Sequence, residues 1–452
     1  MPILHAASAL LPAGWRSEVR LTLENGAIAA IEMGVPPRDG DERHAILIPA
    51  IANVHSHAFQ RAMAGLAEIR GEGTDTFWTW RETMYRFALT MTPDDVEAVA
   101  SQLYVEMLEA GFAAVAEFHY LHHAPDGSPY ASPAEMADRI VAATRAAGIG
   151  LTLLPVFYAH STFGGAAPKP EQKRFITDVG AFQRLVEDCR RTVKGRPNEA
   201  IGVAPHSLRA VTPGELSEVV AIAGDGPIHI HVAEQVKEVE DCVAWSGARP
   251  VRWLLDHAAV DDRWCLVHAT HMDEGETRDA ANSRAVAGLC PITEANLGDG
   301  VFNAEQYLRQ GGRFGIGSDS NVSIGAGAEL RQLEYAQRLK ARARNVLASR
   351  GGSSGRTMLD AVSSGGSQAL MRRSGRLATG AVADIVALSS DHPTLAGKAG
   401  DQILDAWIFS AGNGAVSCVW SGGQKVVVDG RHVSRDPIGS KFRTTMRRLS
   451  EP

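Results

Sequence analysis

The feature that most constrains the fold of this 452-residue sequence is a recurring unit: a short apolar segment that ends in polar residues and is followed by a helical pattern. Short apolar segments of this kind are typical of buried strands. Strands that alternate with helices form parallel βα units, and eight such units predict a (β/α)8 barrel of the TIM type. The eight segments are AILIPAIANVH, AAVAEFHY, GLTLLPVFY, AIGVAPHS, PIHIHVAE, WCLVHATH, VAGLCPITEANLG and FGIGSDSN.

Helix ends are also signalled between these segments. After the first strand, Thr92 suits an N-cap, Pro93 the first helical position and Gly111 the end of the helix. The Gly/Ser-rich clusters 350–355 and 364–367 are interpreted as loops between helices.

Both ends of the chain have the pattern of short strands and tight turns. In RLTLENGAIAAIEM an Asn-Gly pair separates two alternating runs, which is a hairpin signal, and SCVWSGGQKVVVDGRHV carries Gly-Gly and Asp-Gly turns. Because chain ends often lie close together, one small β-sandwich domain is expected from both termini. It takes residues 1–47 and 381–452, the latter with a C-terminal tail, and the barrel takes residues 48–380.

Polar side chains gather at the carboxyl ends of the predicted strands. Barrel enzymes build their active sites at this rim, so these residues are the candidates for a site. They are His55, His57, His119, Tyr120, Tyr158, His206, His231, His268, Asn296 and Asp319.

A metal site is predicted from four of these residues. His55 and His57 lie two apart on a strand, so their imidazoles face the same side and can reach one ion. Taken alone, such a pair can equally be two polar residues at a loop start. Of His229 and His231, the latter lies nearer the strand end and is chosen as the ligand. Asp319, which alone would suit a turn, then supplies an oxygen.

The joint order of these residues around the barrel is more specific than any single motif. Histidines follow strands one, five and six, and an aspartate follows strand eight. Three neutral imidazoles with one carboxylate suit Zn²⁺ or Fe²⁺ better than Mg²⁺ or Ca²⁺. The sequence alone leaves the choice between zinc and iron open.

The motifs VHSH, HVAE, VHATH and GSDS resemble those of the amidohydrolase superfamily, in its mononuclear deaminase branch. The resemblance covers the whole chain, including the split β domain. Binuclear members resemble one another in a bridging lysine after strand four, whereas this strand ends in APHSLR. The resemblance therefore implies one divalent metal per subunit, and it also implies a homodimer.

Longer segments are similar to the formimidoylglutamate deiminase family. They are VHSHAFQRAMAGLAE, TFWTWRETMYRF, AEFHYLHH, APHSLRAV and CPITEANLGDG. This resemblance implies hydrolysis of N-formimino-L-glutamate to N-formyl-L-glutamate and ammonia, a step of histidine degradation.

A small dicarboxylate substrate of this kind requires cationic partners. Guanidinium groups pair with carboxylates through two hydrogen bonds, and Arg81 and Arg209 lie just beyond strand ends. Gln60, Tyr120 and His206 are expected to add neutral hydrogen bonds. Arg81 could instead be a helix-surface cation, and Arg209 could neutralise a nearby acid. Trp78 and Trp80 are expected to pack as a plug of the loop, whereas His122 and His123 are expected at the surface.

The catalytic roles follow from the same resemblance. A bound metal lowers the pKa of its water, from about 15.7 to near 7 in favourable cases. Asp319 is expected to accept the water proton, and Glu234, three residues after His231, to carry protons to the leaving nitrogen. His268 is expected to orient the water or stabilise the intermediate.

Three alternatives are weighed against this interpretation. One is a deaminase of the same branch that acts on a purine or pyrimidine, which would require stacking aromatics and amides rather than paired arginines. Another is an enzyme for a different formimino amino acid. The third is a barrel that serves as a scaffold, although the chain keeps every expected ligand. The segment 58–91 is the candidate lid over the substrate.

Charge and cysteine content limit the setting of the protein. The formal net charge is −7, and no basic block indicates binding to nucleic acid or an anionic membrane. Five scattered cysteines without a CxxC motif suit a reducing compartment. No signal peptide and no apolar run long enough for a membrane span are recognised, so a cytoplasmic location is expected.

Overall fold

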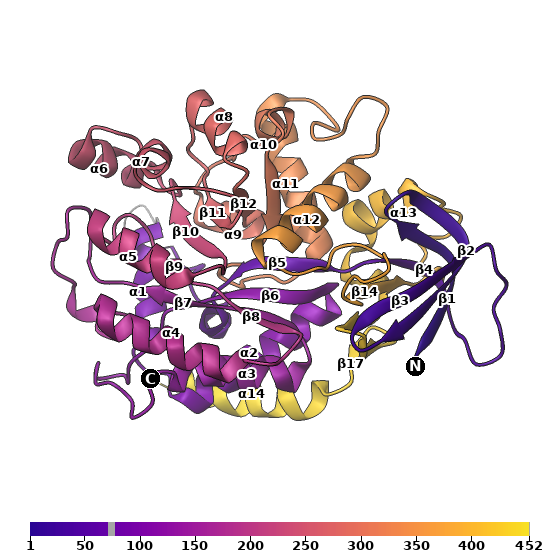
Figure 1. Cartoon of the computed structure of the whole chain (residues 1–452), viewed down its shortest axis with the longest axis horizontal. Helices are drawn as coiled ribbons and strands as arrows, with labels where there is room; N and C mark the ends of the chain where they lie inside the picture. The colour runs from indigo at the N-terminus through magenta and orange to yellow at the C-terminus, as the bar shows by residue number, and fades with distance from the viewer. Residues whose placement is uncertain (71–76, 452) are drawn as a thin grey trace.

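The computed structural model describes residues 1–70 and 77–451, and it confirms the predicted barrel (Figure 1). The strand order around the barrel is β10-β11-β12-β13-β5-β6-β7-β8, and β9 pairs with β7. Each of the eight predicted segments overlaps a strand of this sheet. The strands are β5 (Ile51–Ser56), β6 (Phe112–His119), β7 (Gly150–Phe157), β8 (Glu199–Ile201), β9 (Ala204–Pro205), β10 (Ile228–Val232), β11 (Trp264–His268), β12 (Val286–Leu289) and β13 (Arg313–Ile316).

The barrel closes through parallel pairing on both sides of the ordered strands. Strand β13 pairs with β5. Val203 and Ser207, which flank β9, form bridges to Ile228 and His231 of β10. All these pairings are parallel, so the carboxyl ends of the strands meet at one rim of the barrel.

Helices surround this sheet, and the one helix start that the sequence signalled is confirmed. The predicted N-cap Thr92 forms a capping box with Asp95, and Pro93 starts the helix. The helices that follow the first strand are α1 (Phe77–Ala88), α2 (Pro93–Glu109), α3 (Glu135–Ala147), α4 (Val179–Val193), α5 (Pro213–Ala223), α6 (Val236–Ser246), α7 (Pro250–His257), α8 (Glu274–Asn282), α9 (Pro291–Leu297), α10 (Ala304–Arg309), α11 (Ala326–Ala341) and α12 (Ser354–Ala369).

One predicted loop is wrong, because residues 364–367 lie inside helix α12. Their glycines serve close packing rather than a turn. A Cβ atom on Gly365 would lie 2.0 Å from the carbonyl oxygen of Phe314, and one on Gly366 would lie 3.1 Å from the Cβ of Ala52. The absent side chains therefore let α12 lie directly against strands β13 and β5.

Both termini contribute to a second sheet, seen beside the barrel in Figure 1. It is one hydrogen-bonded sheet of eight strands in the order β17-β16-β15-β14-β4-β1-β2-β3. The Asn25-Gly26 hairpin turn is confirmed, with φ values of 51° and 80°. Its strands are β1 (Ile3–Leu11), β2 (Gly14–Glu24), β3 (Ala27–Met33), β4 (Glu42–Pro49), β14 (Ile385–Leu388), β15 (Val416–Ser421), β16 (Gln424–Val428) and β17 (Arg431–His432).

This second sheet has a core separate from that of the barrel. Side chains from distant strands, among them Val19, Leu21, Ile385 and Trp420, form one buried cluster. One sheet that encloses its own core thus takes the place of two stacked sheets. The chain passes into the barrel at Ala50, since β4 extends to Pro49.

The last helix returns to the barrel. Helix α14 (Arg435–Leu449) packs against α2, and Arg435 forms an ion pair with Glu109.

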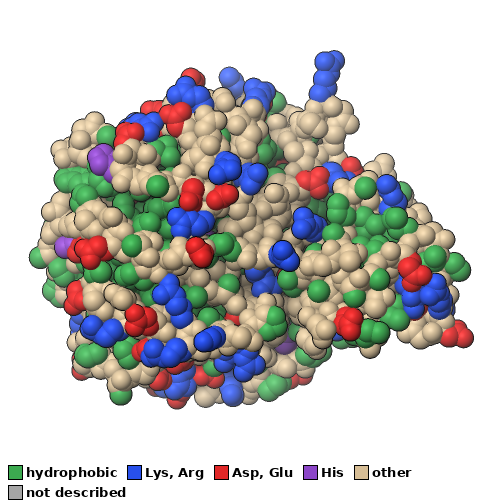
Figure 2. Space-filling view, viewed as in Figure 1, with side chains coloured by type: hydrophobic (Ala, Val, Ile, Leu, Met, Phe, Trp, Pro, Cys, Tyr) green, Lys and Arg blue, Asp and Glu red, His purple; other side chains and the backbone are tan. Residues whose placement is uncertain are grey.

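In the part of the chain that the structure describes, no helix is long and apolar enough to cross a membrane. On the face drawn in Figure 2, basic and acidic side chains are interspersed.

Candidate metal centre and substrate cavity

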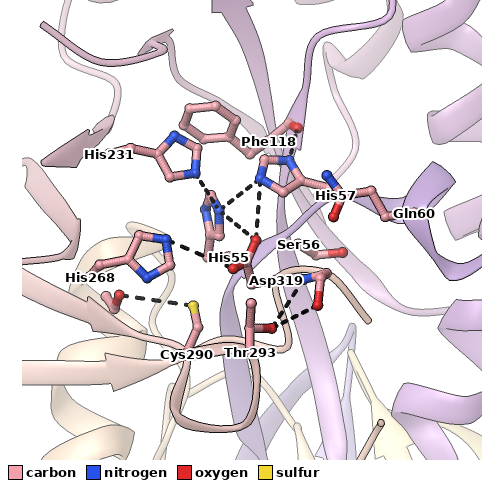
Figure 3. Close-up of polar contacts among 12 residues, drawn as sticks. His55, Ser56, His57, Gln60, Phe118, His231, His268, Cys290, Thr293 and Asp319 are labelled. Carbon is pink, nitrogen blue, oxygen red and sulfur yellow. Dashed lines mark hydrogen bonds and ion pairs between the residues drawn. The ribbon is translucent and has the colours of Figure 1, made fainter. Parts of the chain in front are cut away.

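Three imidazole nitrogens and one carboxylate oxygen converge at the carboxyl rim of the barrel (Figure 3). The Nε2 atom of His55 lies 3.1 Å from that of His57 and 3.0 Å from that of His231. Asp319 Oδ1 lies 3.4 Å from His55 Nε2 and 3.3 Å from His57 Nε2. The structure therefore brings all four predicted ligands together.

Backbone carbonyls fix which nitrogen of His57 and of His231 faces the centre. His57 Nδ1 donates to the carbonyl of Phe118, and His231 Nδ1 donates to the carbonyl of His206, each over 3.0 Å. A carbonyl only accepts, so Nδ1 carries the proton and Nε2 presents a lone pair. His229, two residues before His231, instead bonds the carbonyl of Ala369 and takes no part in the cluster.

The electrostatics of the cluster favour a cation. Burial lowers the pKa of His55 to about 3 and also lowers the pKa values of His57 and His231, so all three rings are neutral. Burial by itself raises the pKa of Asp319, but the adjacent His55 ring and the other nearby imidazoles hold that pKa below its usual value. The centre thus presents three neutral imidazoles and one negative charge.

The spacing of these atoms fits a transition metal. Tetrahedral bonds of about 2.0–2.1 Å place ligand atoms about 3.3 Å apart. The measured separations of 3.0–3.4 Å are close to this value. Lone pairs that face one another without a proton between them are otherwise unfavourable, so the donor set suits a bound divalent ion such as Zn²⁺.

The backbone at this rim is held in an uncommon conformation. Ala233, His268, Ala269, Asp319 and Asn321 all have positive φ values, between 45° and 66°. Such positions are strained for residues other than glycine and persist where the surroundings hold them.

A network of buried hydrogen bonds fixes the loop that carries Asp319. Asn53 donates to the Ser318 hydroxyl over 2.7 Å, and that hydroxyl donates to Asn321 over 2.6 Å. Asn321 in turn donates to the carbonyls of His57 and Asp319. The network joins the two ligand-bearing segments to each other.

Of the three predicted catalytic residues, Asp319 is itself a candidate ligand, and Glu234 and His268 lie beside the cluster. His268 Nε2 is 3.6 Å from Glu234 Oε1 and 3.8 Å from Asp319 Oδ2. Burial raises the pKa of Glu234, and the charge of His268 opposes this rise. Burial lowers the pKa of His268, but the neighbouring carboxylates raise it by more, so the net shift is upward. The carboxylate of Glu238 accepts hydrogen bonds from the backbone of Ala233 and Glu234, which holds Glu234 toward the centre.

Two acidic residues near His268 were missed by sequence reasoning. Glu294 Oε1 lies 3.3 Å from His268 Nδ1 and accepts from the Cys290 backbone. Asp299 is buried near Glu234, and burial raises its pKa. Both lie in the segment CPITEANLGDG, and acidic side chains just beyond a predicted strand were the available signal.

The five predicted substrate-binding residues line one cavity at this rim, together with the catalytic residues. Gln60 donates to the hydroxyl of Tyr120 over 2.9 Å. Arg81 comes from helix α1 and is not a surface cation, because its Nη2 donates to the Tyr158 hydroxyl within the cavity. The remaining predicted residues of the lining are His206 and Arg209.

The two arginines share an aromatic neighbour. The guanidinium carbons of Arg81 and Arg209 lie 5.7 and 5.9 Å from the centroid of the Trp78 ring. These are cation–π distances, so the indole helps to orient both cations. Trp80 contributes to the cavity wall, as does Phe77. The candidate lid 58–91 thus supplies part of the wall, although its residues 71–76 lie outside the described residues.

Some polar strand-end residues have structural roles. Asn296 lies in helix α9 and bonds Glu68, outside the cavity. His119 is buried but does not line the cavity. The prediction that His122 lies at the surface is wrong, because it is 4% exposed and donates to the carbonyl of Val156. His123 is partly buried and donates to Ile176.

Comparison with known proteins agrees with this geometry. The model of the amidohydrolase family matches residues 46–426. The chain belongs to the amidohydrolase family. Its residues 1–45 match a second model, described as the N-terminal domain of formimidoylglutamate deiminase HutF. Members of the amidohydrolase family are metal-dependent hydrolases, which agrees with the convergent donor set of this one.

Individual relatives place this amidohydrolase more narrowly. It is 50% identical to a formimidoylglutamate deiminase from Pseudomonas aeruginosa, over 98% of each chain. An 8-oxoguanine deaminase from the same organism is 26% identical, over 86% of this chain and 83% of that one. A 5-methylthioadenosine/S-adenosylhomocysteine deaminase from Natronomonas pharaonis is 24% identical, over 96% and 94% of the chains.

Solved structures share the fold along the whole chain. An amidohydrolase from Brucella melitensis superposes with a TM-score of 0.96 at 57% identity, with both chains fully covered. An adenosine deaminase from Xanthomonas campestris with bound zinc has a TM-score of 0.82 at 22% identity, over 99% and 98% of the chains. The second likeness concerns the fold alone.

Proposed function

We propose that this amidohydrolase hydrolyses N-formimino-L-glutamate to N-formyl-L-glutamate and ammonia, as a step of histidine degradation. One observation carries the proposal: the cavity beside the convergent ligands contains two guanidinium groups, those of Arg81 and Arg209. Paired guanidiniums complement the two carboxylates of this substrate. The 50% identity to a formimidoylglutamate deiminase supports the same assignment.

We infer a single divalent metal, held by His55, His57, His231 and Asp319, with zinc as the first candidate and Fe²⁺ as the alternative. When bound, the metal acts as a Lewis acid and makes its water a stronger nucleophile near neutral pH. A homodimer and a cytoplasmic location belong to the same proposal, on the family resemblance and the reducing character of the cysteine pattern.

The chain's own residues then bind the substrate and move its protons. Arg81, Arg209, Tyr120 and His206 hold the glutamate part, so that the formimino carbon faces the metal centre. Addition of the water oxygen makes this carbon tetrahedral. The bond to the terminal nitrogen breaks next, and that nitrogen must gain a proton to leave as ammonia.

Glu234 is the proposed proton carrier for this step. Its side chain lies at the metal centre, and burial favours its protonated form, so it can accept a proton from water and return it to the leaving nitrogen. Asp319 shares with Glu234 the role of accepting the proton from water. His268, held by Glu234 and Glu294, faces the tetrahedral carbon as a hydrogen-bond donor.

A steady-state screen tests the proposal. The metal-loaded protein is assayed for ammonia release from N-formimino-L-glutamate, N-formimino-L-aspartate, guanine and adenosine, while metal content is measured in parallel. The highest kcat/KM is expected for formiminoglutamate. Ammonia released from a nucleobase in preference to both formimino amino acids would contradict the proposal, and a protein without metal or turnover would favour a scaffold.

A further inference from the structure

We propose that the phenol of Tyr158 is a further substrate-binding group, which donates a hydrogen bond to one carboxylate of the dicarboxylate substrate. The inference rests on the proposed function and deepens it, because it assigns to the site a specificity-determining residue that follows strand β7.

Tyr158 is fixed in the wall of the substrate cavity. It is 4% exposed and lines the same cavity as Arg81 and Arg209. Its ring lies 4.5 Å from that of His206, and its carbonyl accepts a hydrogen bond from the backbone of Thr177. The position of the phenol is therefore set by the protein before any ligand binds.

The hydroxyl of Tyr158 already accepts two hydrogen bonds. Arg81 Nη2 donates to it over 3.0 Å, and Gln172 Nε2 donates over 2.7 Å. The orientation of the Gln172 amide is fixed, because its Oε1 accepts from the backbone N–H of Lys169 over 2.7 Å. The side that faces Tyr158 is thus the donating NH2 group.

These contacts leave the phenol proton without a partner. A phenol oxygen has one proton to donate, and neither a guanidinium nor an amide NH2 can accept it. Within residues 1–70 and 77–451, the structure gives this hydroxyl no acceptor. A buried donor of this kind requires an acceptor, and the cavity is where a ligand can supply one.

A carboxylate is the acceptor that this environment favours. The Arg81 cation lies next to the phenol, so an anionic oxygen that accepts from Tyr158 also lies near a positive charge. Hydrogen bonds to ionised groups are about twice as strong as neutral ones. Tyr158 and Arg81 would then contact the same carboxylate.

The first test replaces Tyr158→Phe in the metal-loaded enzyme. We expect kcat/KM for formiminoglutamate to fall by about tenfold to a hundredfold, mainly through KM, with metal content and Tm unchanged. Tyr85→Phe is the matched control, because Tyr85 also lies beside Arg81 but does not line the cavity. Its kinetics should equal those of the wild type. An unchanged KM in Tyr158→Phe would overturn the inference.

A second measurement separates substrate contact from support of Arg81. The two mono-amides of formiminoglutamate, at the α- and side-chain carboxyl groups, are assayed with the wild type and Tyr158→Phe. For one amide, the loss of kcat/KM caused by Tyr158→Phe and the loss caused by amidation should be strongly non-additive. For the other amide, the two losses of kcat/KM should add. Additive losses for both amides would overturn the inference.

Binding of N-formyl-L-glutamate by calorimetry gives a readout that needs no turnover. Tyr158→Phe should weaken this binding in parallel with KM, and equal affinity in the variant and the wild type would overturn the inference. Failure of the proposed function is distinct from these results, since it would appear as a wild-type enzyme that does not hydrolyse formiminoglutamate.

Discussion

Glu117 offers a quantitative test of the barrel interior, because it is a carboxyl group with little access to water. It lies in strand β6, is 1% exposed, and accepts a hydrogen bond from the Ala58 backbone over 2.6 Å. Burial raises its pKa to about 8 from 4.5, although the bonds from Ala58 and Ser56 oppose the rise. The folded protein therefore keeps Glu117 protonated at pH values where the unfolded chain ionises it.

The sign of the resulting pH dependence follows from linkage. Because the folded pKa lies above the unfolded pKa, the contribution to stability is fully present below pH 4.5 and is lost as the pH rises through about 8. The shift of about 3.5 units corresponds to an upper value of about 5 kcal/mol, at 1.36 kcal/mol per unit. An unfolding entropy of about 2.1 cal/mol/K per residue, applied to 452 residues, converts this into a Tm change of about 5 °C.

The experiment compares wild type with Glu117→Gln by scanning calorimetry from pH 5 to pH 8.5, with metal at a fixed concentration. Glutamine resembles the protonated acid and does not titrate. The wild-type Tm should therefore fall relative to the variant by about 4 °C across this range. Glu240→Gln, at an exposed position, provides the baseline. A Tm difference that stays constant with pH would refute the reasoning.

Three further predictions concern the site and the fold. Glu234→Gln should keep its metal and lose at least about a thousandfold in kcat, because the side chain can no longer carry a proton; near-normal turnover would remove Glu234 from that role. Arg209→Met should lower kcat/KM for formiminoglutamate by about a hundredfold with metal content unchanged, because a charged partner of the substrate is lost, and an unchanged value would place Arg209 outside substrate binding. Gly365→Ala should lower Tm by several degrees, since the new Cβ would meet the Phe314 carbonyl at 2.0 Å, with Gly214→Ala as a control that has open space and no positive φ. Equal Tm values for these two variants would contradict the packing argument.

The barrel and the clustering of the four candidate ligands were predictable because both rest on local patterns. Strand ends are marked where apolar runs stop, and His55 and His57 share a face through the two-residue period of a strand. Their meeting with His231 and Asp319 then follows from the parallel arrangement, which brings all carboxyl ends to one rim.

The features that sequence reasoning missed depend on contacts between distant segments. Glycines 365 and 366 resemble a loop until strand β13 lies beneath them. From the sequence His122 is expected at the surface, whereas in the fold its ring is buried and donates a hydrogen bond to the Val156 carbonyl. The importance of Tyr158 depends on which partners already occupy its oxygen, and one of these, Arg81, lies 77 positions away in the chain.

The eight-stranded sheet built from both termini has a consequence for synthesis of the protein. Strand β4 lies between β1 and β14, and β14 begins at Ile385. Until the ribosome has made that residue, the β4 edge carries unpaired backbone groups, which are prone to pair with other chains. Completion of the sheet built from both termini is thus delayed until most of the barrel has been translated, and fragments that end before β14 should aggregate through the β4 edge.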